Sequence, residues 1–264
     1  MQNGGSLPVP SVQELSKENL IDVPPRYHRP QQQDLIISQV DHDFPEIPFI
    51  DMHNLLSQQA KYAELQKLHL ACKQWGFFQL VNHGVDSTLL DKVKLEITDF
   101  FNLPMSEKKR FWQSSEDFEG FGQTFVVSEN QKLDWSDVLI LFTRPIHMRK
   151  PHLFPNFPLP LRLSLSLLHV PHLLYFKYLF NYIITNGIYR SIEHRAMVNC
   201  SKERMSFATF LFPKYDGELG PASSLVDEKT QAQYKTTGVK DHLKGFFGRK
   251  LDGKSYVDSK RTNL

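Results

Sequence analysis

Cysteine, charge of one sign and long apolar runs are all scarce in this chain of 264 residues. Its two cysteines, Cys72 and Cys200, cannot build a disulfide framework and fit a reducing compartment, so we expect a cytoplasmic protein. Lysine and arginine number 31 against 29 acidic residues, which leaves a net charge of +2. Because the chain as a whole has no basic excess, nucleic acid is not an expected partner.

The sequence predicts neither a leader nor a membrane span. The first 20 residues lack an apolar core of the signal-peptide kind. Residues 163–184 are apolar enough to raise the question, but His169, Pro171 and Lys177 interrupt them before about 18 nearly uncharged residues accumulate. Hydrophobic residues make up 41% of the chain and aromatic residues 12%, which is enough to fold. We therefore expect a soluble globular protein with no membrane partner.

Composition divides the chain into four segments, of which the first two precede residue 161. Residues 1–44 predict an irregular arm, because Pro24 and Pro25 force an extended backbone. Residues 45–160 predict an N-terminal domain of mixed α and β structure. Apolar runs and periodic apolar spacing predict strands over 47–51, 77–81 and 124–127, a helix over 57–75 stopped by Gly76, and a helix over 87–101 capped by Asp86 or Ser87.

The third and fourth segments follow residue 160. Residues 161–185 are an atypical apolar segment, and the prolines between 145 and 160 end regular structure before it. Residues 186–264 form the C-terminal region. There we expect strands over 187–198 and 205–212 and a helix over 226–247.

The two-residue period of a strand places three useful side chains in this last region. His194 shares a face with small apolar neighbours such as Ala196, which directs it toward a core or a cavity. Arg204 and Ser206 are adjacent on one face, so a guanidinium and a hydroxyl group can hold the same carboxylate. From spacing alone, the alternative is that the histidine is a core residue with hydrogen-bonded ring nitrogens and that the arginine belongs to a structural ion pair.

Other candidates favour structural roles. The pattern predicts that His83 is a turn residue, that His53 beside Asp51 is structural, and that the basic run 108–110 solvates a helix end rather than binding phosphate. Nucleotide-binding glycine loops and the serine-hydrolase motif are missing. Five aromatic residues predict either a pocket for an aromatic substrate or core packing: Phe111, Trp112, Phe118, Phe121 and Phe125.

Several longer blocks resemble one enzyme family. They are Glu46–Asp51 (EIPFID), Ala71–Val85 (ACKQWGFFQLVNHGV), Phe100–Pro104 (FFNLP), Gly120–Gln123 (GFGQ), Lys132–Trp135 (KLDW) and Asn186–Ala196 (NGIYRSIEHRA). In these blocks the chain is similar to the 2-oxoglutarate- and Fe(II)-dependent dioxygenases of plants, in the branch with senescence-related, flavonol-synthase-like and alkaloid-demethylase-like members. The likeness covers most of residues 23–160 and 186–259.

The resemblance implies a mixed α/β fold, in which an N-terminal α/β region packs on a double-stranded β-helix, or jelly-roll, that is incomplete in this chain. It implies Fe(II) as the metal, 2-oxoglutarate as cosubstrate and ascorbate as reductant. The implied reaction is hydroxylation or demethylation of a small, aromatic plant metabolite. By this likeness His194 is a metal ligand, and Arg204 and Ser206 bind 2-oxoglutarate.

The chain departs from the family at the metal. Members hold iron with two histidines and one carboxylate, and a His-x-Asp pair supplies the first two. None of the eleven histidines here is followed two residues later by Asp or Glu. Residues 163–185 stand where the family has core strands, which indicates an internal deletion. Rescue would need His169 or His172 together with an acid in the vacated position.

From this departure we expect an inactive or impaired enzyme, and no residue of the chain is assigned a catalytic role. Two alternatives stay open: a non-catalytic protein that binds a partner or metabolite, and a truncated product without a function of its own.

Overall fold

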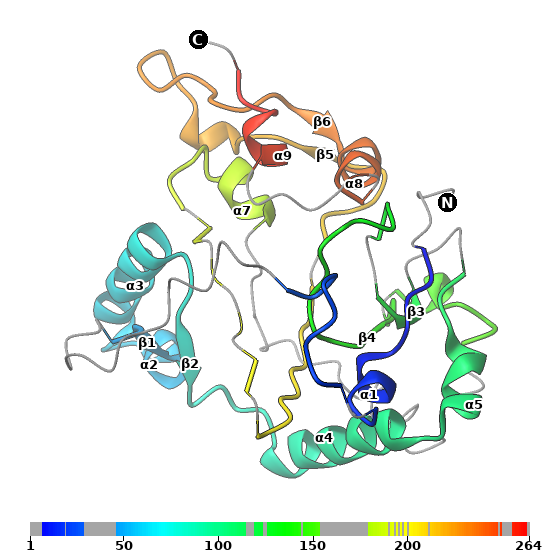
Figure 1. Cartoon of the computed structure of the whole chain (residues 1–264). Coiled ribbons are helices and arrows are strands. Elements are labelled where there is room, and N and C mark those ends of the chain that lie inside the picture. The colour runs from blue at the N-terminus through cyan, green and yellow to red at the C-terminus, as the bar shows by residue number, and fades with distance from the viewer. Residues whose placement is uncertain are drawn as a thin grey trace. The chain divides into compact units, whose positions relative to one another are not determined.

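The structure, a computed structural model, contains two compact units (Figure 1). Unit 1 comprises Met1–His42, Asp86–His169 and Phe247–Leu251, and unit 2 comprises Asp43–Val85, Val170–Phe246 and Asp252–Leu264. The residues that the structure describes are 7–18, 20–28, 46–114, 119–123, 126–143, 145–153, 179–189, 191–192, 194, 196, 198–199, 201–210, 212–247, 249 and 255–262. Each unit has a buried apolar cluster of its own.

Helix α4 (Ser87–Asn102) of unit 1 forms where the apolar spacing predicts it. The Asp86 side chain caps its start by accepting a hydrogen bond from the Thr88 backbone N–H at 2.8 Å. Pro104 follows the helix with extended backbone and cannot continue it. The inward stripe of α4 is buried at Val93, Glu96, Ile97 and Phe100.

Three phenylalanines form the centre of unit 1. Phe100, Phe111 and Phe121 are at most 2% exposed. The ring of Phe100 meets those of Phe111 and Phe121 edge to face, at centroid distances of 5.4 and 6.1 Å. Strand β3 (Gly120–Gly122) carries Phe121 into this cluster and pairs antiparallel with β4 (Val138–Ile140).

Close packing of the same cluster explains the glycine that opens β3. Gly120 has a φ of +118°, and a Cβ atom there would lie 2.6 Å from the Phe111 carbonyl oxygen, so no other residue fits without a shift. Of the aromatic residues expected to form either a pocket or a core, Phe111 and Phe121 belong to the core and Trp112 packs against it, partly buried. The other two lie outside the described residues: Phe118 and Phe125.

The remaining elements of unit 1 are short. They are α1 (Val12–Leu15), α5 (Met105–Lys108) and the 3₁₀ turns η3 (Lys109–Phe111) and η4 (Ile146–Met148). The arm predicted to be irregular therefore contains one turn of helix. The strand predicted over 124–127 is wrong at its described residues, Val126 and Val127. Val126 is buried by packing against Val9 and Leu133 instead of by pairing in a sheet.

The first part of unit 2 follows the sequence prediction. Strands β1 (Phe49–Asp51) and β2 (Gln79–Val81) are parallel, with Ile50 opposite Leu80. Gly76 stops the helical stretch as expected, with a φ of 72° and its N–H donating to the Ala71 carbonyl at 2.9 Å. The two strands are joined by α2 (Met52–Leu56), α3 (Lys61–Leu70) and the π-helical turn η2 (Ala71–Trp75).

The second part of unit 2 packs around an apolar cluster of Ile183, Leu219, Tyr234, Val239 and Val257. Its elements are α7 (Leu179–Ile184), β5 (Glu218–Leu219), the 3₁₀ turn η6 (Ser223–Leu225), β6 (Thr237–Gly238), α8 (Val239–Phe247) and α9 (Ser255–Asp258). Strands β5 and β6 pair antiparallel.

Two expectations for the C-terminal region are corrected. The described residues within 187–198 and 205–212 belong to no strand, because no described segment pairs with them in a sheet. The helix expected over 226–247 begins only at Val239. Asp227 accepts hydrogen bonds from the Lys229 and Thr230 backbone N–H groups at 2.8 and 2.6 Å, and this side-chain turn competes with a helix.

Candidate functional site

His194, the expected metal ligand, lies exposed on a stretch without regular structure in unit 2. Its Nδ1 is 3.1 Å from the Ile192 carbonyl oxygen. The ring of Phe77 lies beside it, at a centroid distance of 5.9 Å and an interplanar angle of 34°. The strand geometry that would direct His194 into a cavity is absent at the described residues of this stretch.

A tight turn precedes His194 and anchors its segment. Asn186 is 3% exposed and has a φ of 52°. Its side chain donates to the Gln231 carbonyl at 3.1 Å and accepts from the Gln233 backbone N–H at 2.7 Å. Through these two bonds Asn186 ties the turn to the segment that leads into β6.

Tyr189 holds the same segment against α3. Its hydroxyl lies 3.1 Å from Nδ1 of His69 on α3, and the two rings meet edge to face at 5.6 Å. Burial, together with the nearby Cys72, raises the pKa of Tyr189. Sequence reasoning missed this pair because His69 and Tyr189 are far apart in the chain and neither belongs to a ligand motif.

Arg204 and Ser206, the expected clamp for 2-oxoglutarate, are both exposed. Within the part of the chain that the structure describes, no hydrogen bond or ion pair joins either of them to His194. The three side chains come from one stretch of sequence, but the structure does not gather them into a site. Their roles remain predictions.

The described residues do not provide an iron-binding donor set. They contain no group of three or more His, Cys, Asp or Glu side chains that could hold a metal ion. The full sequence also lacks a His-x-Asp or His-x-Glu pair, so the donors among the described residues do not make up the ligand set that the resemblance implies. His169 and His172, the candidates for a rescue, lie outside the described residues.

The other two histidines singled out by the sequence lie at a helix start and in a turn. Asp51 caps α2 by accepting from the His53 backbone N–H at 2.8 Å, and also accepts from the Asn82 side chain at 2.8 Å. Nδ1 of His83 accepts from the Val85 backbone N–H at 3.1 Å, as expected of a turn residue.

The basic run 108–110 divides between surface and interior. Arg110 is exposed and pairs with Glu107 at 3.1 Å. Lys108 is only 1% exposed, and its Nζ donates to the Phe101 carbonyl near the end of α4 at 2.9 Å. The basic run thus interacts with a helix end, as predicted, but the amine that does so is buried and not solvated.

Comparison with known proteins identifies the chain's relatives. A family model described as the N-terminal region of a non-haem dioxygenase in morphine synthesis matches residues 47–157, and the model of the 2OG-Fe(II) oxygenase superfamily matches residues 178–213. Protein SRG1 of Arabidopsis thaliana is 41% identical over 350 positions, with 97% of each chain covered. Codeine O-demethylase of Papaver somniferum is 38% identical over 351 positions, with 98% of this chain and 97% of that protein covered.

A solved structure supports the fold. The crystal structure of JOX2 in complex with 2OG, Fe and JA superposes with a TM-score of 0.79 at 23% identity, covering 97% of this chain and 98% of that one. The mixed α/β fold class of the 2OG oxygenases is thereby confirmed, and the incompleteness of the jelly-roll stays a prediction. The alignments with SRG1 and codeine O-demethylase are longer than the 264 residues of this chain, so those relatives have positions for which it has no residue.

These findings define a class of protein: the chain belongs to the plant 2-oxoglutarate- and Fe(II)-dependent dioxygenase family. Its similarity to SRG1 and to an alkaloid demethylase places it in the branch that the sequence blocks indicate. Among the helices that the structure describes, none has the length and apolar character needed to span a bilayer.

Proposed function

We propose that this chain is an oxidoreductase-family member whose iron-dependent activity is impaired. One observation carries the proposal: the described residues hold no cluster of three metal-binding side chains, and the sequence has no His-x-Asp or His-x-Glu pair. A single neutral imidazole does not hold Fe(II) in competition with water, because a usable site needs several ligands and their supporting partners.

In intact members, O₂ oxidises both substrates: one oxygen atom enters succinate as 2-oxoglutarate loses CO₂, and the other hydroxylates a small metabolite, which can lead to its demethylation. By analogy with the named substrate of codeine O-demethylase, we propose a small, aromatic substrate for this chain's lineage, with ascorbate as reductant and the cytoplasm as its location. His194 would be the one surviving iron ligand.

The 2-oxoglutarate clamp is proposed to survive in weakened form. Arg204 and Ser206 supply a guanidinium and a hydroxyl that suit a carboxylate. Both are exposed, so water and salt screen the interaction. We therefore expect weak binding of a dicarboxylate that needs no iron.

Succinate release tests the proposal directly. The full chain is incubated with 2-oxoglutarate, Fe(II) and ascorbate, and a relative such as codeine O-demethylase with its own substrate verifies the assay. We expect no succinate above background, and the same result for His194→Ala. Clear turnover that His194→Ala abolishes would contradict the proposal.

Metal binding provides a test that does not depend on the substrate. Anaerobic calorimetric titration with Fe(II) should give no tight stoichiometric binding, and His194→Ala should leave the titration unchanged. A one-to-one complex that is lost in His194→Ala would show that the site is intact.

A second candidate function is non-catalytic binding through the N-terminal part. It is favoured by the family match over residues 47–157 and by the packed aromatic core of unit 1. This candidate predicts saturable thermal stabilisation by a small aromatic compound without iron, unaffected by His194→Ala. A panel of such compounds that gives no shift would reject it.

A third reading is a truncated product without a function of its own. Sequencing the transcript across the codons for residues 163–185 distinguishes it from the other two. If the transcript encodes the missing core strands, we expect the complete protein translated from it to be the active enzyme.

A further inference from the structure

The N-terminal helix α1 is held by a carboxylate far away in the chain. Asp137 accepts hydrogen bonds from the Ser11 hydroxyl at 2.6 Å and from the Val12 and Gln13 backbone N–H groups at 3.0 and 3.1 Å. These are the backbone donors that a helix start leaves without an intrahelical partner. The side chain that caps α1 is therefore Asp137, which lies just before β4, and not a side chain at the start of the helix.

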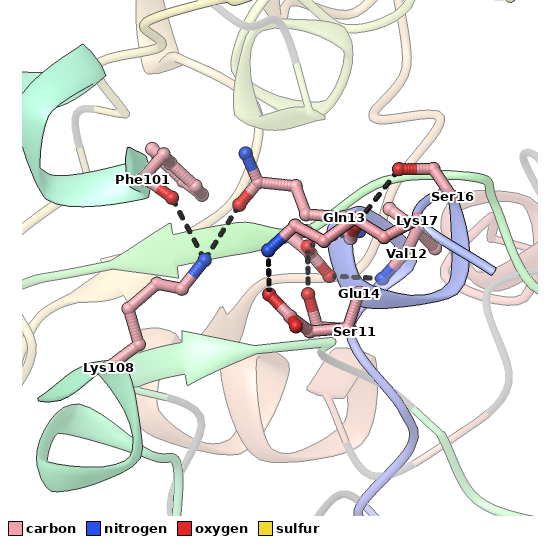
Figure 2. Close-up of polar contacts among 9 residues, drawn as sticks. Ser11, Val12, Gln13, Glu14, Ser16, Lys17, Phe101 and Lys108 are labelled. Atoms are coloured by element: carbon pink, nitrogen blue, oxygen red, sulfur yellow. Dashed lines mark hydrogen bonds and ion pairs between the residues drawn. The ribbon is translucent and has the colours of Figure 1, made fainter. Parts of the chain in front are cut away.

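A buried amine holds the same helix from the other side. Nζ of Lys108 donates to Oε1 of Gln13 and to the Phe101 carbonyl, both at 2.9 Å (Figure 2). The ammonium also lies 5.4 Å from the centroid of the Phe121 ring. Lys108 therefore connects α1 to the end of α4 and to the aromatic core.

Apolar contacts complete the attachment. Val9 and Val12 are 5% and 6% exposed, and Val9 packs with Val126 and Leu133. The Leu7 backbone N–H donates to the Val126 carbonyl at 2.8 Å. Residues 7–16, which we call the strap, thus contact the rest of unit 1 at positions from Leu7 to Gln13.

The strap does not contribute to the main core of unit 1. That core is formed by Val93, Ile97, Phe100, Phe111, Phe121 and Leu153, all of which follow residue 86. Removing the strap would leave these contacts in place. Lys108 would keep the Phe101 carbonyl as an acceptor, and Asp137, which is already partly exposed, would be hydrated.

The strap also cannot stay helical when detached. Its helix has four residues, far fewer than the dozen or so that an isolated helix needs in water. Attachment and helix formation are therefore one event. Both family models also leave the strap unmatched, since they begin at residues 47 and 178.

We propose that residues 7–16 are a detachable strap, latched by Asp137 and Lys108, that opens while the aromatic core of unit 1 remains folded. Opening melts α1 and uncovers the apolar surface of Val126 and Leu133. The latch is electrostatic in character, because a carboxylate and an ammonium provide its polar contacts.

Hydrogen exchange of the full chain, read by mass spectrometry, tests the proposal. In the wild-type protein, amides of the strap should exchange faster than those of α4, because local opening needs less free energy than opening of the core. Asp137→Asn removes the charge and one good acceptor, and should speed exchange of the strap about tenfold or more while α4 is unchanged. Gln13→Ala, which removes the Lys108 contact from the strap side, should act in the same direction and is mild enough to preserve folding.

Glu14→Gln is the matched control. Glu14 lies on the same helix, but its ion pair is with Lys17 at the surface, at 2.7 Å. Exchange in this variant should stay within about twofold of wild type. The proposal is overturned if strap and α4 exchange at the same rate in the wild type, or if Asp137→Asn and Gln13→Ala change both segments equally or neither.

Discussion

The Tyr256 hydroxyl donates to the backbone carbonyl of His242 at 2.8 Å, and the two rings meet at a centroid distance of 5.0 Å and an angle of 63°. This contact joins α9 to α8 in unit 2. His242 is fully buried, and burial, with a smaller effect from the charge of Lys260, lowers the pKa of its imidazole to about 4.

Unit 2 should therefore lose stability in mild acid. The unfolded chain protonates His242 near its ordinary pKa of 6.5, whereas the folded chain keeps it neutral down to about pH 4. Since the unfolded state binds more protons in this window, the free energy of unfolding should fall as the pH drops through it, by on the order of 3 kcal/mol at most. Urea unfolding followed by circular dichroism at several pH values measures the slope. In His242→Leu the slope should be shallower, and an unchanged slope would assign the acid sensitivity to other groups.

The aromatic core of unit 1 should dominate its stability. Phe100 is 0% exposed at the centre of the phenylalanine cluster, and Phe100→Ala should cost about 3–5 kcal/mol through lost burial and the cavity left behind. Leu95 lies on the same helix with 61% of its surface exposed, so Leu95→Ala should change the free energy of unfolding by less than about 0.5 kcal/mol. Equal urea midpoints for the two variants would contradict the packing described.

The turn at Asn186 should depend on both its backbone and its side chain. Asn186→Ala loses two buried hydrogen bonds. It also puts alanine at a positive φ, which asparagine tolerates better because its polar side chain can hydrogen-bond nearby. We therefore expect a destabilisation of about 2–4 kcal/mol. Asn186→Gly loses the same bonds but accepts the backbone conformation, and should be less destabilising by about 1 kcal/mol. Thermal unfolding compares the two, and a glycine variant less stable than the alanine variant would refute this account.

The stretch with the expected clamp should promote association between molecules. Phe207 and Phe210 are 50% and 48% exposed on a segment that the structure assigns to no strand, and exposed apolar side chains so close together favour association between molecules. The double variant Phe207→Ser, Phe210→Ser should aggregate more slowly in light scattering at raised temperature. Tyr62→Ser removes an aromatic ring that is 79% exposed on α3 and should change little. If both variants aggregate alike, this stretch is not the cause.

Local signals predicted the elements whose formation needs few distant contacts. Asp86 caps α4, Gly76 ends the first helical stretch at positive φ, and the apolar runs around Ile50 and Leu80 become the parallel strands β1 and β2. Each depends on side-chain chemistry within a few residues. The same kind of reading failed where a distant partner decides the outcome. Alternating apolar residues over 205–212 predicted a strand, but alternation provides a strand only when a neighbour completes the ladder.

Reading the sequence alone was enough to determine the family, the cap of α4 and the lack of a His-x-Asp pair, because motifs and caps are short-range chemistry. Only the tertiary structure decided that Lys108 is buried under α1 and that Asp137 holds the start of that helix. It also decided that His194 lies exposed beside Phe77. These facts depend on which segments meet in space, and a linear pattern of residues does not specify the partner of a buried charge.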